Sequence, residues 1–189
     1  MTANLLTGLR LLLVAPMGLA MGHPLSAWGH WAMAIVAVGI ATDIADGKVA
    51  RRAGAGTAFG QFFDHTTDFL FVTVGLAGSA ASGATPPWLP ILIVLAFVQY
   101  VIDSRFLHHS PALRMSWLGR RNGMLYFAPL CLVAVGRSGF AGGWGRMLLG
   151  AACALSYLLV VSTLLSIVDR GVASVRLTQT RGPESRSRP

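Results

Sequence analysis

Charged residues are scarce in this chain: Asp, Glu, Lys and Arg make up only 12% of its 189 residues. That share is about half of what soluble domains carry, and disordered segments are usually more charged still. Hydrophobic residues account for 54% of the chain. The composition therefore excludes a water-soluble globule and a disordered chain. It predicts a membrane protein whose length allows a single domain.

Lysine and cysteine are nearly absent as well. Lys48 is the only lysine beside fourteen arginines, and the net charge is +8. These bases occur in short clusters between apolar runs rather than along one stripe, so we expect no nucleic-acid partner. Cys131 and Cys153 both lie inside apolar runs. That position predicts small membrane-buried side chains rather than a disulfide or a zinc site.

Long apolar runs divide the chain into predicted membrane spans. Residues 11–42 contain no Asp, Glu, Lys or Arg, and Gly22-His23-Pro24 breaks this run into two helices. A membrane helix needs about 20 apolar residues. The expected spans are about Leu5–Met21, Ala27–Ala45, Gly60–Ala81, Trp88–Leu107, Asn122–Val135 and Met147–Val168. The predicted fold class is an all-α, polytopic integral membrane bundle of about six transmembrane helices.

The basic residues fall unequally on the two sides of this bundle. Thirteen lie on the side of the termini, and only Arg137 and Arg146 lie on the other. Basic loops stay in the cytoplasm, so both termini are expected there, in a membrane of the bacterial inner or plasma type. Residues 1–168 are predicted to form the membrane domain. Residues 169–189 are predicted to form a basic, flexible cytoplasmic tail that faces membrane lipids.

Four of the seven acidic residues lie within 26 positions: Asp43, Asp46, Asp64 and Asp68. Their spacings of three and four residues place each pair on one face of a helix, and two antiparallel helices would bring all four together. Carboxylates that close need cations to remain ionised. Oxygen ligands suit Mg²⁺ or Mn²⁺, and two such ions form a site for phosphoryl chemistry. The sequence therefore predicts a two-metal site.

Two other interpretations of these acids stay open. Arg51 and Arg52 could join them in a structural network at the membrane surface, but two arginines would leave two acids unpaired. A divalent-cation transporter could also use clustered acids, but a pore needs them near mid-membrane with a polar path to both faces. These acids lie beside the cytoplasmic bases, which favours an enzyme.

The acidic motif resembles the signature of the CDP-alcohol phosphatidyltransferase family, which is D-x-x-D-G-x-x-A-R, eight residues, then G-x-x-x-D-x-x-x-D. Residues 43–51 and 60–68 match all eight fixed positions with the correct gap. The resemblance implies a metal-dependent enzyme of phospholipid biosynthesis. Such an enzyme moves a phosphatidyl group from CDP-diacylglycerol, or a related CDP-alcohol, to an acceptor hydroxyl and releases CMP.

The resemblance also assigns roles to individual residues. Asp43, Asp46, Asp64 and Asp68 match the metal-site aspartates, and Asp68 matches the general base. The positions that accommodate CDP are matched by Gly47, Ala50, Arg51 and Gly60. Arg51 has a forked guanidinium that suits a phosphate oxygen.

The N-terminal segment from Asn4 to Arg10 resembles the start of phosphatidylglycerophosphate synthases, which implies glycerol 3-phosphate as the small polar acceptor. The anionic acceptor would need an arginine pocket, for which the candidates are Arg105, Arg114, Arg120 and Arg121. Residues 65–67 depart from that subgroup, so inositol phosphate and serine stay open as acceptors. Gly75 and Gly78 permit close helix packing, including the packing of a homodimer.

Overall fold

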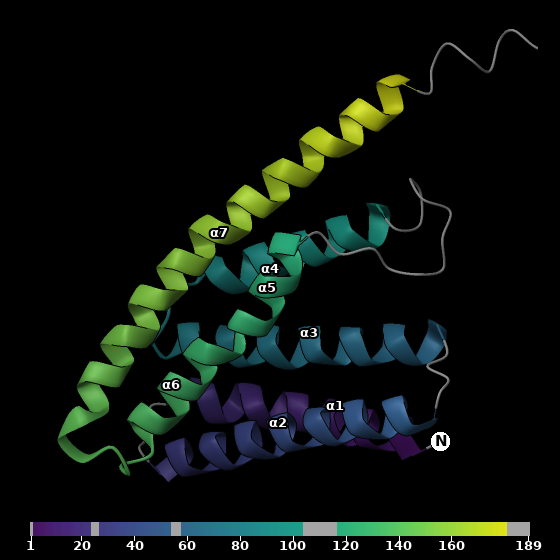
Figure 1. Ribbon diagram of the computed structural model, residues 1–189. Helices are drawn as coiled ribbons and strands as arrows, with labels where there is room; N and C mark the ends of the chain where they lie inside the picture. Colours follow the sequence, from purple (N-terminus) through teal and green to yellow (C-terminus); the bar gives the residue numbers. More distant parts are fainter. Residues whose placement is uncertain (1, 24–26, 54–57, 104–116, 181–189) are drawn as a thin grey trace, which may run out of the picture.

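The computed structural model describes residues 2–23, 27–53, 58–103 and 117–180. Within these ranges every regular element is a helix, which confirms the all-α prediction (Figure 1). The elements are α1 (Thr2–Gly22), α2 (Ala27–Ala53), α3 (Ala58–Ala81), α4 (Trp88–Ile102), α5 (Trp117–Leu125), α6 (Phe127–Arg137), the short 3₁₀ helix η2 (Gly142–Trp144) and α7 (Gly145–Thr180).

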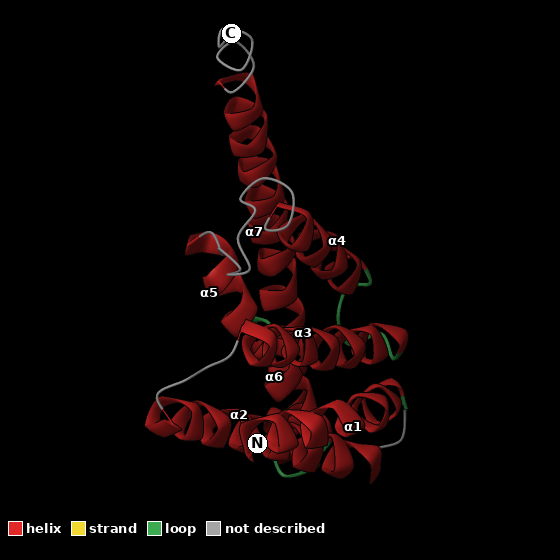
Figure 2. Cartoon of the chain, turned by 90° about the vertical axis from the view of Figure 1, so that its right-hand side faces the viewer, coloured by secondary structure: helices red, strands yellow, loops and turns green. Residues whose placement is uncertain are grey.

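Helices α1, α2 and α3 lie side by side, and the long α7 runs obliquely past α6 and α4 (Figures 1 and 2). Tyr126 alone separates α5 from α6. The two helices together cover the predicted fifth span, and its break has a local cause. Proline clashes with the carbonyl four residues earlier, and for Pro129 that residue is Leu125, where α5 ends.

Three helices are long and apolar enough to cross a membrane: those containing residues 5–22, 28–45 and 142–172. The helix Trp88–Ile102 is apolar but shorter. Many large apolar side chains face outward, as in Leu12 with 74% and Leu158 with 68% of its surface exposed. This outer surface is that of a protein solvated by lipid rather than water. The number of six spans stays a prediction.

Small residues allow α1 and α3 to approach closely. A Cβ atom added to Gly18 would lie 2.6 Å from a side-chain carbon of Val74, and Gly22 faces the backbone of Gly78. Met17 and Phe71 are fully buried beside this crossing. The predicted packing role of Gly78 is therefore seen within the chain. The close crossing fixes the position of α1 relative to α3 near the C-terminal ends of both helices.

Arg137 joins the ends of α1 and α3 on the side opposite the acidic motif. Its guanidinium donates hydrogen bonds to the carbonyl oxygen of Met21 at 2.6 Å, to that of His23, and to the hydroxyl of Ser82 at 3.1 Å. Burial lowers the pKa of Arg137, yet an arginine stays protonated in proteins. The charge therefore remains available to cap these helix ends.

One part of the predicted tail is wrong. Helix α7 does not end near Val168 but continues to Thr180, so residues 169–180 are helical rather than flexible. The physical reason is that this stretch has no proline and only one glycine, Gly171, and the next strong helix breaker is Gly182-Pro183. Residues 181–189 lie outside the described residues, and the division into a domain and a tail stays a prediction.

Candidate metal and active site

Three of the four motif aspartates meet at one end of the bundle. Asp43 comes from α2, while Asp64 and Asp68 lie one turn apart on α3. One carboxylate oxygen from each lies within 4.8 Å of the others. Such a donor set of carboxylate oxygens suits a hard divalent ion. Asp43, Asp64 and Asp68 could therefore hold a divalent metal ion together.

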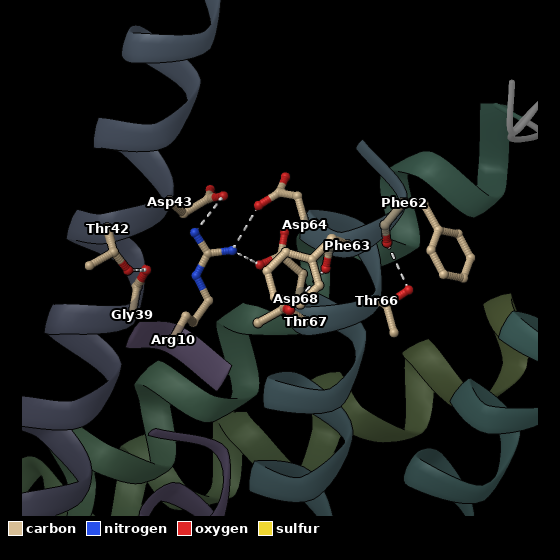
Figure 3. Close-up of polar contacts among 10 residues, drawn as sticks. All are labelled: Arg10, Gly39, Thr42, Asp43, Phe62, Phe63, Asp64, Thr66, Thr67 and Asp68. Carbon is tan, nitrogen blue, oxygen red and sulfur yellow. Dashed lines mark hydrogen bonds and ion pairs between the residues drawn. The ribbon is translucent and has the colours of Figure 1, made fainter. Parts of the chain in front are cut away.

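The guanidinium of Arg10, from α1, lies between these carboxylates (Figure 3). Its Nη2 is 3.4 Å from Asp43 Oδ1, and its Nη1 is 3.3 Å from Asp64 Oδ1 and also contacts Asp68 Oδ1. The side chain of Arg10 is completely buried, whereas the three carboxylates keep between 29% and 49% of their surface exposed. A buried charge needs such partners to offset its lost hydration.

Sequence reasoning missed Arg10 as a residue of this site. It interpreted Arg10 as a topological charge and as part of an N-terminal resemblance. A signal was nevertheless present, because Arg10 directly precedes the long uncharged run and belongs to the helix that begins it. A charge inside an apolar helix is a candidate functional residue by default.

The other predicted donor-site residues are only partly described. Asp46, Gly47, Ala50 and Arg51 all belong to α2, which continues to Ala53 as the motif spacing requires, but their side chains lie outside the described residues. Gly60 is in the first turn of α3, one turn before Asp64. The ends of the eight-residue gap between the two motif halves belong to α2 and α3, and residues 54–57 between them lie outside the described residues.

A cavity of about 490 Å³ adjoins the aspartates, and Asp43 and Asp68 both line it. Much of its wall is apolar and comes from α3, α4 and α6. Among these residues are Phe69, Val72, Ile93, Phe97 and Phe127. Helix α7 contributes Thr163, Ser166 and Arg170. The cavity therefore combines an apolar wall with polar groups beside the carboxylates, which is the usual make-up of a small-molecule site.

Several polar groups of the cavity wall have unused hydrogen-bonding capacity. Within the described part of the chain, no partner is found for three buried atoms, namely Gln99 Oε1, the hydroxyl oxygen of Tyr100 and Asn122 Nδ2. All three residues line the cavity. A buried polar group without a partner costs about 1–3 kcal/mol. These atoms are therefore positioned to form hydrogen bonds with a molecule bound in the cavity.

Of the four arginines predicted for the acceptor, Arg120 lines the cavity. Arg121 is not among its lining residues, and Arg105 and Arg114 lie outside the described residues. A second cavity arginine, Arg170, was not predicted. It lies 5.2 Å from the centre of the Tyr100 ring and 4.0 Å from Asp103. Its distance in sequence from the motif explains why spacing alone could not assign it.

His65 also lines the cavity, one residue after Asp64 on the exposed side of α3. His65 is therefore part of the cavity wall and does not face only the lipid or solvent around the bundle.

Residues 1–170 match the family described as CDP-alcohol phosphatidyltransferase. The chain belongs to the CDP-alcohol phosphatidyltransferase family. The match covers all six predicted spans and both halves of the acidic motif, as the sequence predicted. It ends at Arg170, the cavity arginine of α7. Arg10 contacts Asp43 and Asp68, and these two aspartates line the same cavity as Arg170.

Curated relatives of this phosphatidyltransferase family member match it over part of their length. A Mycobacterium tuberculosis protein named "Probable phosphatidylglycerophosphate synthase" is 34% identical over 122 residues, which are 62% of this chain and 58% of the relative. A Streptomyces coelicolor protein named cardiolipin synthase (CMP-forming) is 26% identical over 62% of this chain and 61% of its own length. The chain therefore matches about three fifths of each relative. No solved structure gives a significant match.

Proposed function

We propose that this chain transfers a phosphatidyl, or related phospho-alcohol, group from CDP-diacylglycerol or another CDP-alcohol to an acceptor hydroxyl and releases CMP. The observation that carries the proposal is the meeting of Asp43, Asp64 and Asp68 beside a cavity within a family-matched region. Transfer forms a bond from the acceptor oxygen to the β-phosphorus and breaks the bond from that phosphorus to the oxygen of CMP.

Asp68 is the proposed general base. It is the one aspartate of α3 that lines the cavity, where an acceptor hydroxyl would enter. A base must lie within hydrogen-bond reach of the proton that it accepts. Asp68 would take the proton of the attacking hydroxyl as the new bond forms. Divalent ions bound by this cluster, with Asp46 as the fourth ligand of the motif, would neutralise charge on the diphosphate.

The donor nucleotide is proposed to lie along α2 and the start of α3. Gly47, Ala50 and Gly60 offer little side-chain bulk, which lets a nucleotide approach the backbone. Arg51 would hold a phosphate oxygen. We propose that this end of the bundle faces the cytoplasm, because the donor's nucleotide needs water while its acyl chains stay in lipid.

Glycerol 3-phosphate is the proposed acceptor. The phosphate would bind the guanidinium groups of Arg120 and Arg170, and the hydroxyls would find hydrogen-bond partners at Gln99, Tyr100 and Asn122. A relative named as a phosphatidylglycerophosphate synthase supports this choice. Inositol phosphate offers the same phosphate-and-polyol chemistry and is an alternative, whereas serine has no phosphate for the arginines.

A second acceptor class is favoured by the apolar side of the cavity. Phe69, Val72, Ile93 and Phe97 form a wall that a small polar molecule would leave uncovered. An acceptor alcohol carried on a lipid would cover it. One relative is named a cardiolipin synthase.

The deciding experiment is an acceptor panel. The purified protein in lipid nanodiscs with Mg²⁺ and CDP-diacylglycerol would be given glycerol 3-phosphate, inositol 1-phosphate, inositol, serine or phosphatidylglycerol, and CMP release would be measured. We expect the fastest release with glycerol 3-phosphate. Fastest release with phosphatidylglycerol would instead assign the lipid acceptor. Absence of CMP with every acceptor, in protein shown to be folded, would contradict the enzymatic proposal itself.

A further inference from the structure

The guanidinium of Arg10 and a metal ion bound by the three aspartates would compete for the same space. Two oxygens on opposite sides of a bound Mg²⁺ lie about 4.2 Å apart, because each Mg–O distance is about 2.1 Å. The carboxylate oxygens of Asp43, Asp64 and Asp68 already lie within 4.8 Å of one another. The two terminal nitrogens of Arg10 contact one oxygen of each of these three carboxylates. A metal ion held by all three oxygens would therefore occupy the region where the guanidinium now lies.

Charge leads to the same conclusion. The three carboxylates attract any cation, and the guanidinium already supplies one (Figure 3). Two cations a few ångströms apart in a partly buried site repel each other strongly. Arg10 reaches the cluster from α1, which contributes none of the clustered aspartates. Displacement of Arg10 from the cluster would therefore not require α2 or α3, which carry the ligands, to move with it.

We propose that Arg10 is a resident counter-ion of the aspartate cluster, which a divalent ion displaces when it binds. The inference rests on the proposed function only in taking a divalent ion as the ligand. In the metal-free protein Arg10 holds the three carboxylates together and offsets their repulsion. The metal then binds in exchange for these ion pairs, so Arg10 weakens metal binding and is a positioning residue rather than a catalytic one.

The test is direct metal binding without substrate. Mn²⁺ would be titrated into the purified, metal-free protein in detergent, and free Mn²⁺ would be followed by electron paramagnetic resonance. Arg10→Gln removes the charge but keeps a polar side chain. We expect its dissociation constant for Mn²⁺ to fall by about ten-fold or more, because a charge at this distance shifts an ionic equilibrium by one to three powers of ten. Arg10→Lys should give an intermediate value.

A matched control removes the same charge elsewhere. Arg146 is exposed at the start of α7, and Arg146→Gln should bind Mn²⁺ as the wild type does. Equal or weaker Mn²⁺ binding by Arg10→Gln would overturn the proposal and show that Arg10 supports the metal site. If Arg10→Gln does not fold, Arg10→Lys decides, because displacement predicts tighter binding than in the wild type.

The two proposals fail differently. Absence of Mn²⁺ binding in both the wild type and the Arg10 variants would remove the metal site on which the proposed function depends. Mn²⁺ binding that is the same in all of them would remove only the counter-ion role. Thermal melting gives a second readout, since the metal-free Arg10→Gln protein should melt below the wild type and gain more stability from Mn²⁺.

Discussion

Gly78 of α3 lies against the backbone of Gly18 of α1 so closely that a Cβ atom at position 78 would be 2.3 Å from the Gly18 carbonyl oxygen. Only glycine fits this contact. Arg10 lies about two turns before Gly18 on α1, and Asp68 lies nearly three turns before Gly78 on α3. The helix crossing therefore also sets how far Arg10 is from the aspartates of α3.

We expect Gly78→Ala to destabilise the protein by about 1–3 kcal/mol, because an added methyl group overpacks a contact made by rigid backbone. Thermal melting in detergent measures the loss. Gly150→Ala is the matched control, since a Cβ atom at Gly150 meets nothing within 4 Å. That variant should be at least as stable as the wild type, because alanine favours a helix by about 1 kcal/mol over glycine. Equal melting of both variants would contradict the close crossing.

Asp68→Asn should reduce the rate of CMP release by a factor of about 10² to 10⁴, the usual range for loss of a general base. Asp169→Asn removes the same charge from an exposed position on α7 and should leave the rate unchanged. Both variants should remain folded by circular dichroism. A turnover near the wild-type rate in Asp68→Asn would exclude Asp68 as the base.

Arg120→Ala should raise the KM for a phosphorylated acceptor by about ten-fold or more, since a hydrogen bond to a charged group contributes about 1.5–3 kcal/mol. The KM for the CDP-alcohol should change little. Arg121→Ala is the neighbouring control, because Arg120 lines the cavity and Arg121 does not. A larger effect at Arg121 would show that the acceptor binds outside this cavity.

Arg137→Ala should destabilise the protein by about 1.5–3 kcal/mol through loss of the charged hydrogen bonds at the ends of α1 and α3. The rate of CMP release per folded molecule should stay the same, because this arginine lies at the end of α1 opposite Arg10. Melting curves and rates at a low temperature separate the two effects. A folded variant with slow turnover would contradict the prediction.

Removal of divalent ions with EDTA should abolish CMP release, and added Mg²⁺ or Mn²⁺ should restore it. The metal-free protein should nevertheless remain folded, because Arg10 already pairs with the three carboxylates. This expectation differs from that for small metal-dependent domains, which unfold without their ion. Circular dichroism before and after EDTA treatment tests it, and loss of helix on chelation would count against a stabilising role for Arg10.

The sequence predicted the helices that carry the acidic motif because their spacing is that of one helical face. Asp43, Asp64 and Asp68 meet as the paired spacings require, and α2 extends through the whole first half of the motif. The family could also be predicted from the sequence, since a motif of eight fixed positions with a fixed gap is specific to it. These features depend on the spacing of residues that are close together in the sequence, and this spacing can be read from the sequence directly.

The rest of the site depends on distant contacts. Arg10 lies 54 residues before Asp64, and Arg170 lies far beyond the motif, so no spacing rule connects either with it. The helical continuation to Thr180 carries no hydrophobic signal, because residues 169–180 are mostly polar. The cavity is lined by six helices, α2 to α7, and by Tyr126 at the break between α5 and α6, and its shape depends on how those helices cross.

Tyr126, at the joint between α5 and α6, is tied to α7 by a hydrogen bond of 2.7 Å between its hydroxyl and that of Thr163, and Ser162 donates a further bond to Asn122 at 2.8 Å. Arg120 lies on the short helix α5, which precedes this joint in the chain. The position of the Arg120 side chain therefore depends on α7, which lies some forty residues later in the chain. Substitutions on α7 that do not contact a substrate would then change the selectivity for the acceptor alcohol. Acceptor selectivity would therefore change during evolution without any substitution of the aspartates.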